Sequence, residues 1–142
     1  MARIKDIFHN RLMYAVDRSL TVAEAAARMA EAGVGAILVL DDGRLCGIFS
    51  ERDLMLRVVV KGLDPARTLV QDIMTTQVAT IESTGTVEEA MELMDRYKCR
   101  HLPVLHGGMP AGMISMRDVI HYELERKTEE IRQMRAYIHG NA

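Results

Sequence analysis

Residues 47–53 read GIFSERD, and residues 112–118 read GMISMRD. The two stretches lie 65 positions apart and share Gly, Ser, Arg and Asp in the same register. Each follows an apolar run and precedes a segment with helical character, so the shared residues fall where a strand passes into a helix. The first N–H groups of a helix lack backbone partners, and the helix dipole is positive there. Such turns therefore favour polar and often anionic ligands.

The similarity extends beyond these two motifs and indicates an internal duplication. Residues 21–54 align with residues 86–119 without a gap, and twelve of the thirty-four positions are identical. Chance at a fixed offset would give only about two identities, so the two halves are copies of one unit. A weaker match, shifted by one residue, relates 4–8 to 70–74. A segment that contains Gly and Pro, residues 61–68, is predicted to link the halves.

Composition indicates a compact globular protein. Its 142 residues are 49% apolar but only 4% aromatic, with eleven Met, so aliphatic and Met side chains must fill the core. The net charge of −2 argues against a broad nucleic-acid surface. The sequence has no apolar run as long as a membrane span and no hydrophobic signal region. With two Cys and no disulfide framework, we expect a soluble, cytoplasmic protein that contacts neither nucleic acid nor membrane.

Each half is predicted to run strand, helix, strand, strand, helix. Helices should begin after Thr21 and Thr86, because each opens a Ser/Thr-x-x-Glu capping box. Pro103 cannot donate to a ladder, so we expect its strand to lie at a sheet edge there. The third strands are predicted to end at Ser50 and Ser115, where the last helices begin. The patterns place the first strands at 13–16 and 78–81 and the second strands at 36–40 and 101–105. Hairpin turns are predicted at 41–43 and 106–108.

The last helix is predicted to continue to about His139, because neither Gly nor Pro interrupts it. It carries an apolar stripe, broken by Lys127, that consists of Ile120, Leu124, Ile131, Met134 and Ile138. The stripe could dock on its own domain or pack on a second subunit. The second interpretation is favoured, since this helix outruns its counterpart in the first half, and we therefore expect a homodimer.

The two motifs allow both a structural and a ligand-binding interpretation. Ser50 and Asp53, like Ser115 and Asp118, have the spacing of a helix N-cap. A cap alone requires neither the Gly before the Ser nor the Arg before the Asp, yet both copies contain them. An ionised Asp can accept from both hydroxyls of a ribose, while the Ser hydroxyl, the helix-start N–H groups and the Arg can bind phosphate. Flanking aliphatic side chains such as Ile48, Ile114 and Ile37 can hold a flat base.

These residues resemble a tandem pair of cystathionine β-synthase (CBS) domains, often called a Bateman module. The resemblance covers about residues 1–125 and rests on both Gly-x-x-Ser-x-x-Asp motifs, on RHLPV at 100–104 and on VQDIMT at 70–75. It implies an α/β fold in which two β-α-β-β-α repeats pack about a pseudo-twofold axis, followed here by an extended C-terminal helix. The predicted units are a first repeat at 1–62, a linker at 63–68, a second repeat at 69–125 and a helical extension at 126–142.

The family's two clefts each combine the motif of one repeat with strand residues of the other. By resemblance, the first cleft, here called the Asp53 cleft, contains Ser50, Glu51, Arg52, Asp53, Thr80, Cys99, Arg100 and His101, with Ile37 beside the base. The second, the Asp118 cleft, contains Ser115, Met116, Arg117, Asp118, Ala15, Val34 and Gly35. A hydroxyl at Thr80 and a cation at Arg100 occur only in the first, so we expect it to bind a phosphorylated nucleoside more tightly. The second could be weaker, adapted to another ligand, or empty.

Neither a metal centre nor a catalytic site is predicted. The five His residues show no recognised metal spacing. Cys99 and His101 belong to one strand, whose alternating side chains cannot complete a metal site alone. The motifs pair no base with Ser50 or Ser115, as nucleophilic catalysis would require.

The resemblance therefore implies a non-catalytic sensor that binds an adenine nucleotide. AMP ranks first, and ADP, ATP, NAD(H) and S-adenosylmethionine are the alternatives. The ligand would touch both repeats and shift their arrangement, and an unidentified effector protein would receive the signal. Two other interpretations stay open: a dimeric scaffold with vestigial clefts and, with much less support, an enzyme that acts on a nucleotide.

Overall fold

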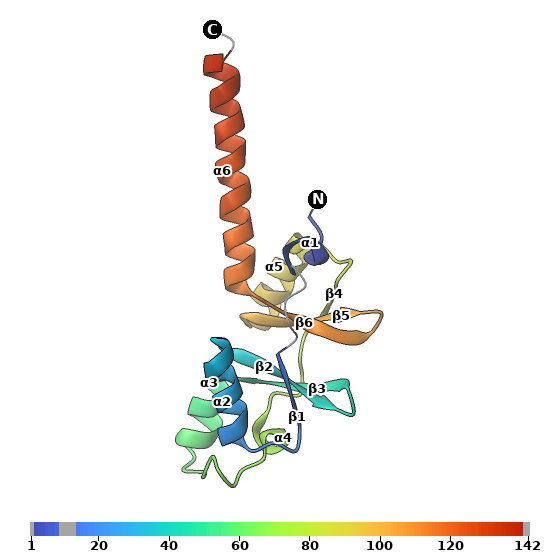
Figure 1. Cartoon of the computed structure of the whole chain (residues 1–142), viewed down its shortest axis with the longest axis vertical. Coiled ribbons are helices and arrows are strands. Elements are labelled where there is room, and N and C mark those ends of the chain that lie inside the picture. Colours follow the sequence, from blue (N-terminus) through green and yellow to red (C-terminus); the bar gives the residue numbers. More distant parts are fainter. Residues whose placement is uncertain (1, 9–13, 141–142) are drawn as a thin grey trace.

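The computed structural model describes residues 2–8 and 14–140. In these residues, each repeat contains a three-stranded mixed sheet, with strand orders β1-β2-β3 and β4-β5-β6. The sheets meet through β3 and β6, and α6 projects far beyond the second repeat (Figure 1). The predicted α/β fold of two CBS repeats with a long C-terminal helix is confirmed.

The elements follow one another in the same order in both repeats. Their bounds are α1 Ile4–Phe8, β1 Ala15–Asp17, α2 Val22–Ala32, β2 Ala36–Asp41, β3 Arg44–Ser50, α3 Glu51–Asp53, the π-helix η1 Leu54–Val59, α4 Val70–Ile73, β4 Ile81–Glu82, α5 Val87–Tyr97, β5 His101–His106, β6 Met109–Ser115 and α6 Met116–Gly140. The first strand, predicted at 13–16, is observed at Ala15–Asp17, and Met13 lies outside the described residues.

Helices α2 and α5 begin where the capping boxes predict. Thr21 Oγ1 accepts from the Glu24 N–H at 3.2 Å, and Thr86 Oγ1 accepts from the Glu89 N–H at 3.1 Å. The Glu side chains in turn accept from the N–H groups of the two Thr residues, which completes both boxes. Apolar residues at helical spacing then face the core, so each helix covers its own sheet.

The hairpin turns also form where the sequence predicts them. Asp42 and Gly43 have φ values of 50° and 79°, and Gly107 and Gly108 have values of 59° and 82°. Positive φ at both central residues is the signature of a type I′ turn, whose twist matches that of the flanking strands. The two halves thus share turn chemistry as well as strand order.

Pro103 changes the first strand of the second repeat. In the first repeat, the Leu38 N–H donates to the Tyr14 carbonyl at 3.1 Å. Pro103 is the counterpart of Leu38 and has no N–H, and β4 begins only at Ile81, so the strand predicted at 78–81 is shorter than expected. The predicted edge position is wrong for β5 as a whole, which is the central strand. Pro103 itself, however, has no partner on β4, because the described register begins with Ile81 opposite Val104.

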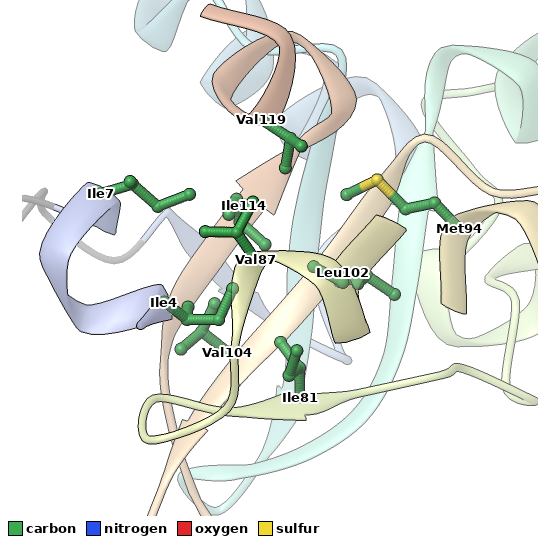
Figure 2. Packing of buried hydrophobic residues seen from close by; sticks show 10 residues of the cluster. Ile4, Ile7, Ile81, Val87, Met94, Leu102, Val104, Ile114 and Val119 are labelled. Atoms are coloured by element: carbon green, nitrogen blue, oxygen red, sulfur yellow. The ribbon is translucent and has the colours of Figure 1, made fainter. Parts of the chain in front are cut away.

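The two hydrophobic cores are built by crossed packing of short helices. Ile4 and Ile7 of α1, at the start of the chain, are buried in the core of the second repeat. Figure 2 shows both side chains in the cluster with Val104 and Ile114. The Ile4 N–H donates to the carbonyl of Gly85 at 2.8 Å, which fixes α1 on the second repeat.

Helix α4 makes the reciprocal contact. Its Val70 and Ile73 are buried in the core of the first repeat, and the Val70 N–H donates to the Leu20 carbonyl at 2.8 Å. Each core therefore contains a helix from the other half of the sequence. The division at 1–62 and 69–125 remains a proposal about repeats along the sequence, because in space neither core is made by one repeat alone.

The last helices of the two repeats differ. After α3, residues Leu54–Val59 form a π-helix rather than the ordinary helix predicted, with the Val60 N–H donating to the Met55 carbonyl at 3.0 Å. In the second repeat, α6 continues for 25 residues, and only Val119 is buried among its residues. The apolar stripe of α6 therefore does not dock on its own domain.

Gly47 is required where the segment after α4 crosses β3. A Cβ added there would lie 2.5 Å from Met74 Sδ and 2.9 Å from the Thr75 carbonyl oxygen, and the latter is backbone that cannot move easily. We predict that Gly47→Ala lowers the free energy of unfolding by about 1–3 kcal/mol through overpacking, measured by urea denaturation. Gly35→Ala is the control, because its added Cβ comes no closer than 3.5 Å to Glu51. Equal stability of the two variants would contradict the prediction.

Candidate functional site

Both Gly-x-x-Ser-x-x-Asp motifs form helix caps. Ser50 Oγ accepts from the Asp53 N–H at 3.2 Å, and Asp53 Oδ2 accepts from the Ser50 N–H at 3.0 Å. In the second motif, Ser115 Oγ accepts from the Asp118 N–H at 3.1 Å, and Asp118 Oδ2 accepts from the Ser115 N–H at 2.8 Å. The structural interpretation of these residues is therefore correct for both copies, and any ligand must act on side chains that already cap a helix.

Asp53 has further partners beyond the cap. Its Oδ2 also accepts from the Ser50 hydroxyl, and its Oδ1 accepts from the Thr75 hydroxyl at 3.0 Å. Arg57 Nε lies 3.7 Å from the same Oδ1. Asp53 is buried, and its side chain is 9% exposed. A desolvated carboxylate thus joins the first repeat to the segment that follows α4.

Arg57 strengthens this junction from the same helix. Its Nη1 donates to the carbonyl oxygens of Ile73 at 3.2 Å and Met74 at 3.0 Å. These are the carbonyls at the end of α4, where cationic groups are favoured by the helix dipole. Asp53 and Arg57 together fix the position of Thr75 at one wall of a cleft.

The cleft has a volume of about 740 Å³, within the range of small-molecule sites, and both repeats contribute to it. From the first repeat and the segment after α4 come Gly35, Ile48, Ser50, Glu51, Arg52, Asp53, Leu56, Arg57 and Thr75. From the second come Gln77, Val78, Ala79, Tyr97, Lys98, Cys99, Arg100 and His101. This is the Asp53 cleft of the sequence analysis, and it brings together seven of the eight residues expected to surround its ligand.

Three predicted residues lie elsewhere. Thr80 lines a separate, smaller cavity of about 380 Å³ beside the two hairpins and is not among the residues that line the Asp53 cleft. Ile37 is 2% exposed in the core of the first repeat, because its place on β2 faces the covered side of the sheet. Ile48, also expected beside the base, does line the cleft. Gly35 was assigned to the Asp118 cleft but lines the Asp53 cleft.

Charge distinguishes the Asp53 cleft from its counterpart. Its lining contains Arg52, Arg57, Lys98 and Arg100, against the carboxylates of Glu51 and Asp53. Sixty-five positions away, Arg52 has a cationic counterpart in Arg117. The counterparts of Arg57, Lys98 and Arg100 are uncharged: they are Tyr122, Gly33 and Gly35. At these four equivalent positions, the Asp118 side therefore has one cation where the Asp53 side has four. Ala15, Val34, Ser115, Met116, Arg117 and Asp118 line neither of the two cavities described above.

The helix-start donors contribute less to anion binding than the sequence predicts. The Glu51 N–H donates to the Gly35 carbonyl at 3.0 Å, and the equivalent Met116 N–H donates to the Arg100 carbonyl at 2.8 Å. The Asp53 N–H is taken by Ser50, as described above. An anion in the Asp53 cleft must therefore rely mainly on cationic side chains.

Lys98, Arg57 and Tyr97 were missed in the sequence analysis. Lys98 ends α5 in the left-handed conformation, with φ 52°, where α2 ends with Gly33 at φ 67°. A non-glycine residue at such a cap is uncommon and strained. Comparison of the two halves would have exposed this signal, because Gly33 and Lys98 occupy equivalent positions.

His101 lies between the two motifs. Burial lowers its pKa below the ordinary value, and the nearby Arg100 acts in the same direction, while the carboxylates of Asp118 and Glu51 oppose this change. Its imidazole is therefore predominantly neutral at pH 7. Burial likewise raises the pKa of the Cys99 thiol, which argues against a reactive thiolate.

No cluster of three His, Cys, Asp or Glu side chains that could hold a metal ion occurs within residues 2–8 and 14–140. Across the same residues, no helix has the length and apolar character that crossing a membrane requires.

Comparison with known proteins defines the class. The chain matches the CBS domain family at residues 4–60 and again at 70–125. It therefore belongs to the proteins that contain two tandem CBS domains. Among curated proteins, the mitochondrial CBS domain-containing protein CBSX3 of Arabidopsis thaliana is 35% identical over 125 residues, covering 84% of this chain. The chain spans 61% of the length of that relative.

Two solved structures have the same fold. A protein with CBS domains from Burkholderia ambifaria MC40-6 has 35% sequence identity and a TM-score of 0.83, covering 87% of this chain and 95% of that one. A CBS domain protein from Pyrobaculum aerophilum, solved in complex with AMP, has 28% identity and a TM-score of 0.75. That match covers 82% of this chain and 88% of the other.

The lowered pKa of His101 predicts a pH dependence. Between its folded pKa and about 6.5, the unfolded chain binds a proton at this residue more readily than the folded protein does. Stability should therefore fall as the pH drops below about 6.5. In His101→Gln, urea denaturation should show a smaller loss of unfolding free energy between pH 7 and 5. His121→Gln, at an exposed position on α6, is the control. The same pH slope in parent and His101→Gln would refute this.

Proposed function

We propose that this protein is a non-catalytic sensor that binds an adenine nucleotide in the Asp53 cleft, with AMP as the first candidate. One observation carries the proposal: a nearly buried carboxylate and four cationic side chains, drawn from both repeats, line a single cleft of nucleotide size. The AMP complex of the Pyrobaculum aerophilum relative supports an adenosine ligand.

The carboxylate of Asp53 is the proposed ribose acceptor. An ionised carboxylate offers about four acceptor sites, and the Ser50 N–H, the Ser50 hydroxyl and the Thr75 hydroxyl use three of them. Two ribose hydroxyls therefore require one of these hydroxyl donors to rotate away. Since Thr75 belongs to the segment after α4, ribose binding is linked to how that segment is held.

The remaining parts of a nucleotide find matching chemistry on the same walls. Val78 and Ala79 of the second repeat and Ile48 and Leu56 of the first all line the cleft, and these apolar side chains can contact an adenine. Arg52, Arg57, Lys98 and Arg100 offer charge-assisted donors to phosphate. A monophosphate carries charge comparable to the net excess of two cations in the lining, which favours AMP as the first ligand to test.

Signalling follows from the position of the ligand between the repeats. A ligand that touches both repeats stabilises the arrangement in which both sets of contacts are made, and so shifts the population toward it. Because α1 and α4 are each buried in the core of the other repeat, a relative movement of the repeats would change the packing of both cores. A separate effector protein would read the change.

A non-catalytic role is supported by the extent of the relatives. The match to the Burkholderia ambifaria protein covers 95% of that chain, so little of it lies outside the CBS repeats. The scaffold interpretation is the outcome if the cleft binds no nucleotide.

We predict that Asp53→Asn weakens AMP binding about 10- to 100-fold, because an amide oxygen cannot replace a carboxylate that accepts from two hydroxyls. Isothermal titration calorimetry on protein freed of bound nucleotide would measure the change. Asn can still accept from the Ser50 N–H, so the helix cap and the fold should persist. Asp118→Asn, the matched change in the second repeat, should leave this affinity unchanged. Equal loss in both variants, or none in either, would count against the Asp53 cleft.

Lys98 tests the phosphate half of the same cleft. Lys98→Gly should stabilise the nucleotide-free protein by roughly 0.5–1 kcal/mol, because glycine adopts the left-handed cap conformation without strain. It should also weaken AMP binding by about three- to tenfold, more at low salt, since one partly screened cation is lost. Lys98→Ala should weaken binding equally without the gain in stability, which separates charge from strain. An unaltered AMP affinity in both variants would remove Lys98 from the site.

A further inference from the structure

The C-terminal part of α6 lies outside the CBS fold. The family match ends at residue 125, whereas α6 continues to Gly140. At about 1.5 Å per residue, the whole helix is roughly 37 Å long. Every residue from 124 to 140 is exposed, and Figure 1 shows this part standing clear of both repeats. No part of its own described chain covers it.

The exposed helix carries a narrow apolar seam. Residues Ile120, Leu124, Ile131, Met134 and Ile138 are between 51% and 63% exposed. Their spacing places Leu124, Ile131 and Ile138 at heptad position a and Ile120 and Met134 at position d. Lys127 occupies the remaining d position. Five of the six seam positions over three heptads are therefore apolar.

This part of α6 has no tertiary packing within the described chain. Most helical stability in proteins comes from the packing of an apolar face, which is missing here. The apolar seam of the helix is in contact with solvent, and its burial would be favourable. Salt bridges within the helix, such as Arg126 to Glu130 at 3.7 Å and Arg132 to Glu129 at 3.2 Å, are exposed and contribute little. A partner of matching shape would bury this seam and stabilise the helix.

We propose that this seam pairs with α6 of a second copy of the chain, in parallel and in register, as a two-stranded coiled coil. The seam is only two positions wide and flanked by polar residues, which fits one opposing helix rather than a broad groove. Isoleucine at two of the three a positions favours two parallel strands.

Charge complementarity specifies the parallel orientation. In a parallel pair, a residue at position g faces position e of the next heptad in the partner. Glu130 at g then faces Arg135 of the partner subunit, and the twofold axis forms this pair twice. In an antiparallel pair with matched a and d layers, Glu130 would instead face its own copy across the axis, and like charges would repel.

Lys127 fits the parallel pair as a register determinant. Its Nζ lies 3.8 Å from Glu130 Oε2 on the same helix, and Glu123 lies one turn earlier, so acidic groups flank the two ammonium groups. A single polar residue in the seam costs stability but excludes registers in which it would face an apolar layer.

Cysteine cross-linking tests the pairing directly. In the parallel coil, position 134 faces its own copy, so Met134→Cys should form an intermolecular disulfide with diamide, seen on a non-reducing gel. Gln133→Cys, one position outside the seam, should cross-link at least tenfold more slowly. The native Cys46 and Cys99 give a low background, because burial raises the pKa of both thiols.

A second variant removes the seam without touching the CBS repeats. Ile131→Glu combined with Met134→Cys should abolish the cross-link, whereas Gln133→Glu with Met134→Cys should keep it. Light scattering on the unmodified chain should give twice the chain mass of 15.9 kDa. A monomer at micromolar concentration, equal rates for Met134→Cys and Gln133→Cys, or a cross-link that survives Ile131→Glu would each overturn the proposal. AMP titration of the same variants is independent of this result, so failure of the coil and failure of the nucleotide site are distinguishable.

Discussion

The crossed packing of two short helices is the constraint on which the rest of the structure depends. Ile4 and Ile7 complete the core of the second repeat, and Val70 and Ile73 complete that of the first. Each buried aliphatic side chain contributes about 1.5–3 kcal/mol, so neither core is complete without the other half of the chain. The two repeats therefore fold as one unit, and the cleft between them has walls whose separation is set by both cores.

Within this frame, one carboxylate has two tasks. Asp53 closes the cap of α3 and also accepts from Thr75, so it holds the segment that crosses β3 beside Gly47. A ligand that needs the same oxygens must compete with Thr75. In the proposed sensor, recognition of the ribose and the relative position of the repeats are thus linked through a single buried group.

Duplication provides two equivalent frames but not two equivalent sites. Both motifs form the same cap, which explains why Ser and Asp recur, whereas the surrounding positions have diverged. Gly33 and Lys98, which occupy equivalent positions, are the clearest case. Gly33 suits the left-handed cap, whereas Lys98 accepts strain and lines the cleft, with its Nζ 3.2 Å from Asp95 Oδ1. Such strain persists where the rest of the structure determines the backbone.

The sequence by itself determined whatever depends on nearby residues: the capping boxes at Thr21 and Thr86, the type I′ turns, the seam of α6 and the repeat that indicates two CBS domains. It also determined most of the Asp53 cleft, through the resemblance. Only the tertiary structure decided that α1 and α4 exchange cores and that β4 is short opposite Pro103. It also decided that Arg57 and Lys98 line the cleft while Thr80 and Ile37 do not. The physical reason is range. Caps and turns are settled by hydrogen bonds within a few residues, whereas core membership and cleft walls depend on partners more than sixty positions away.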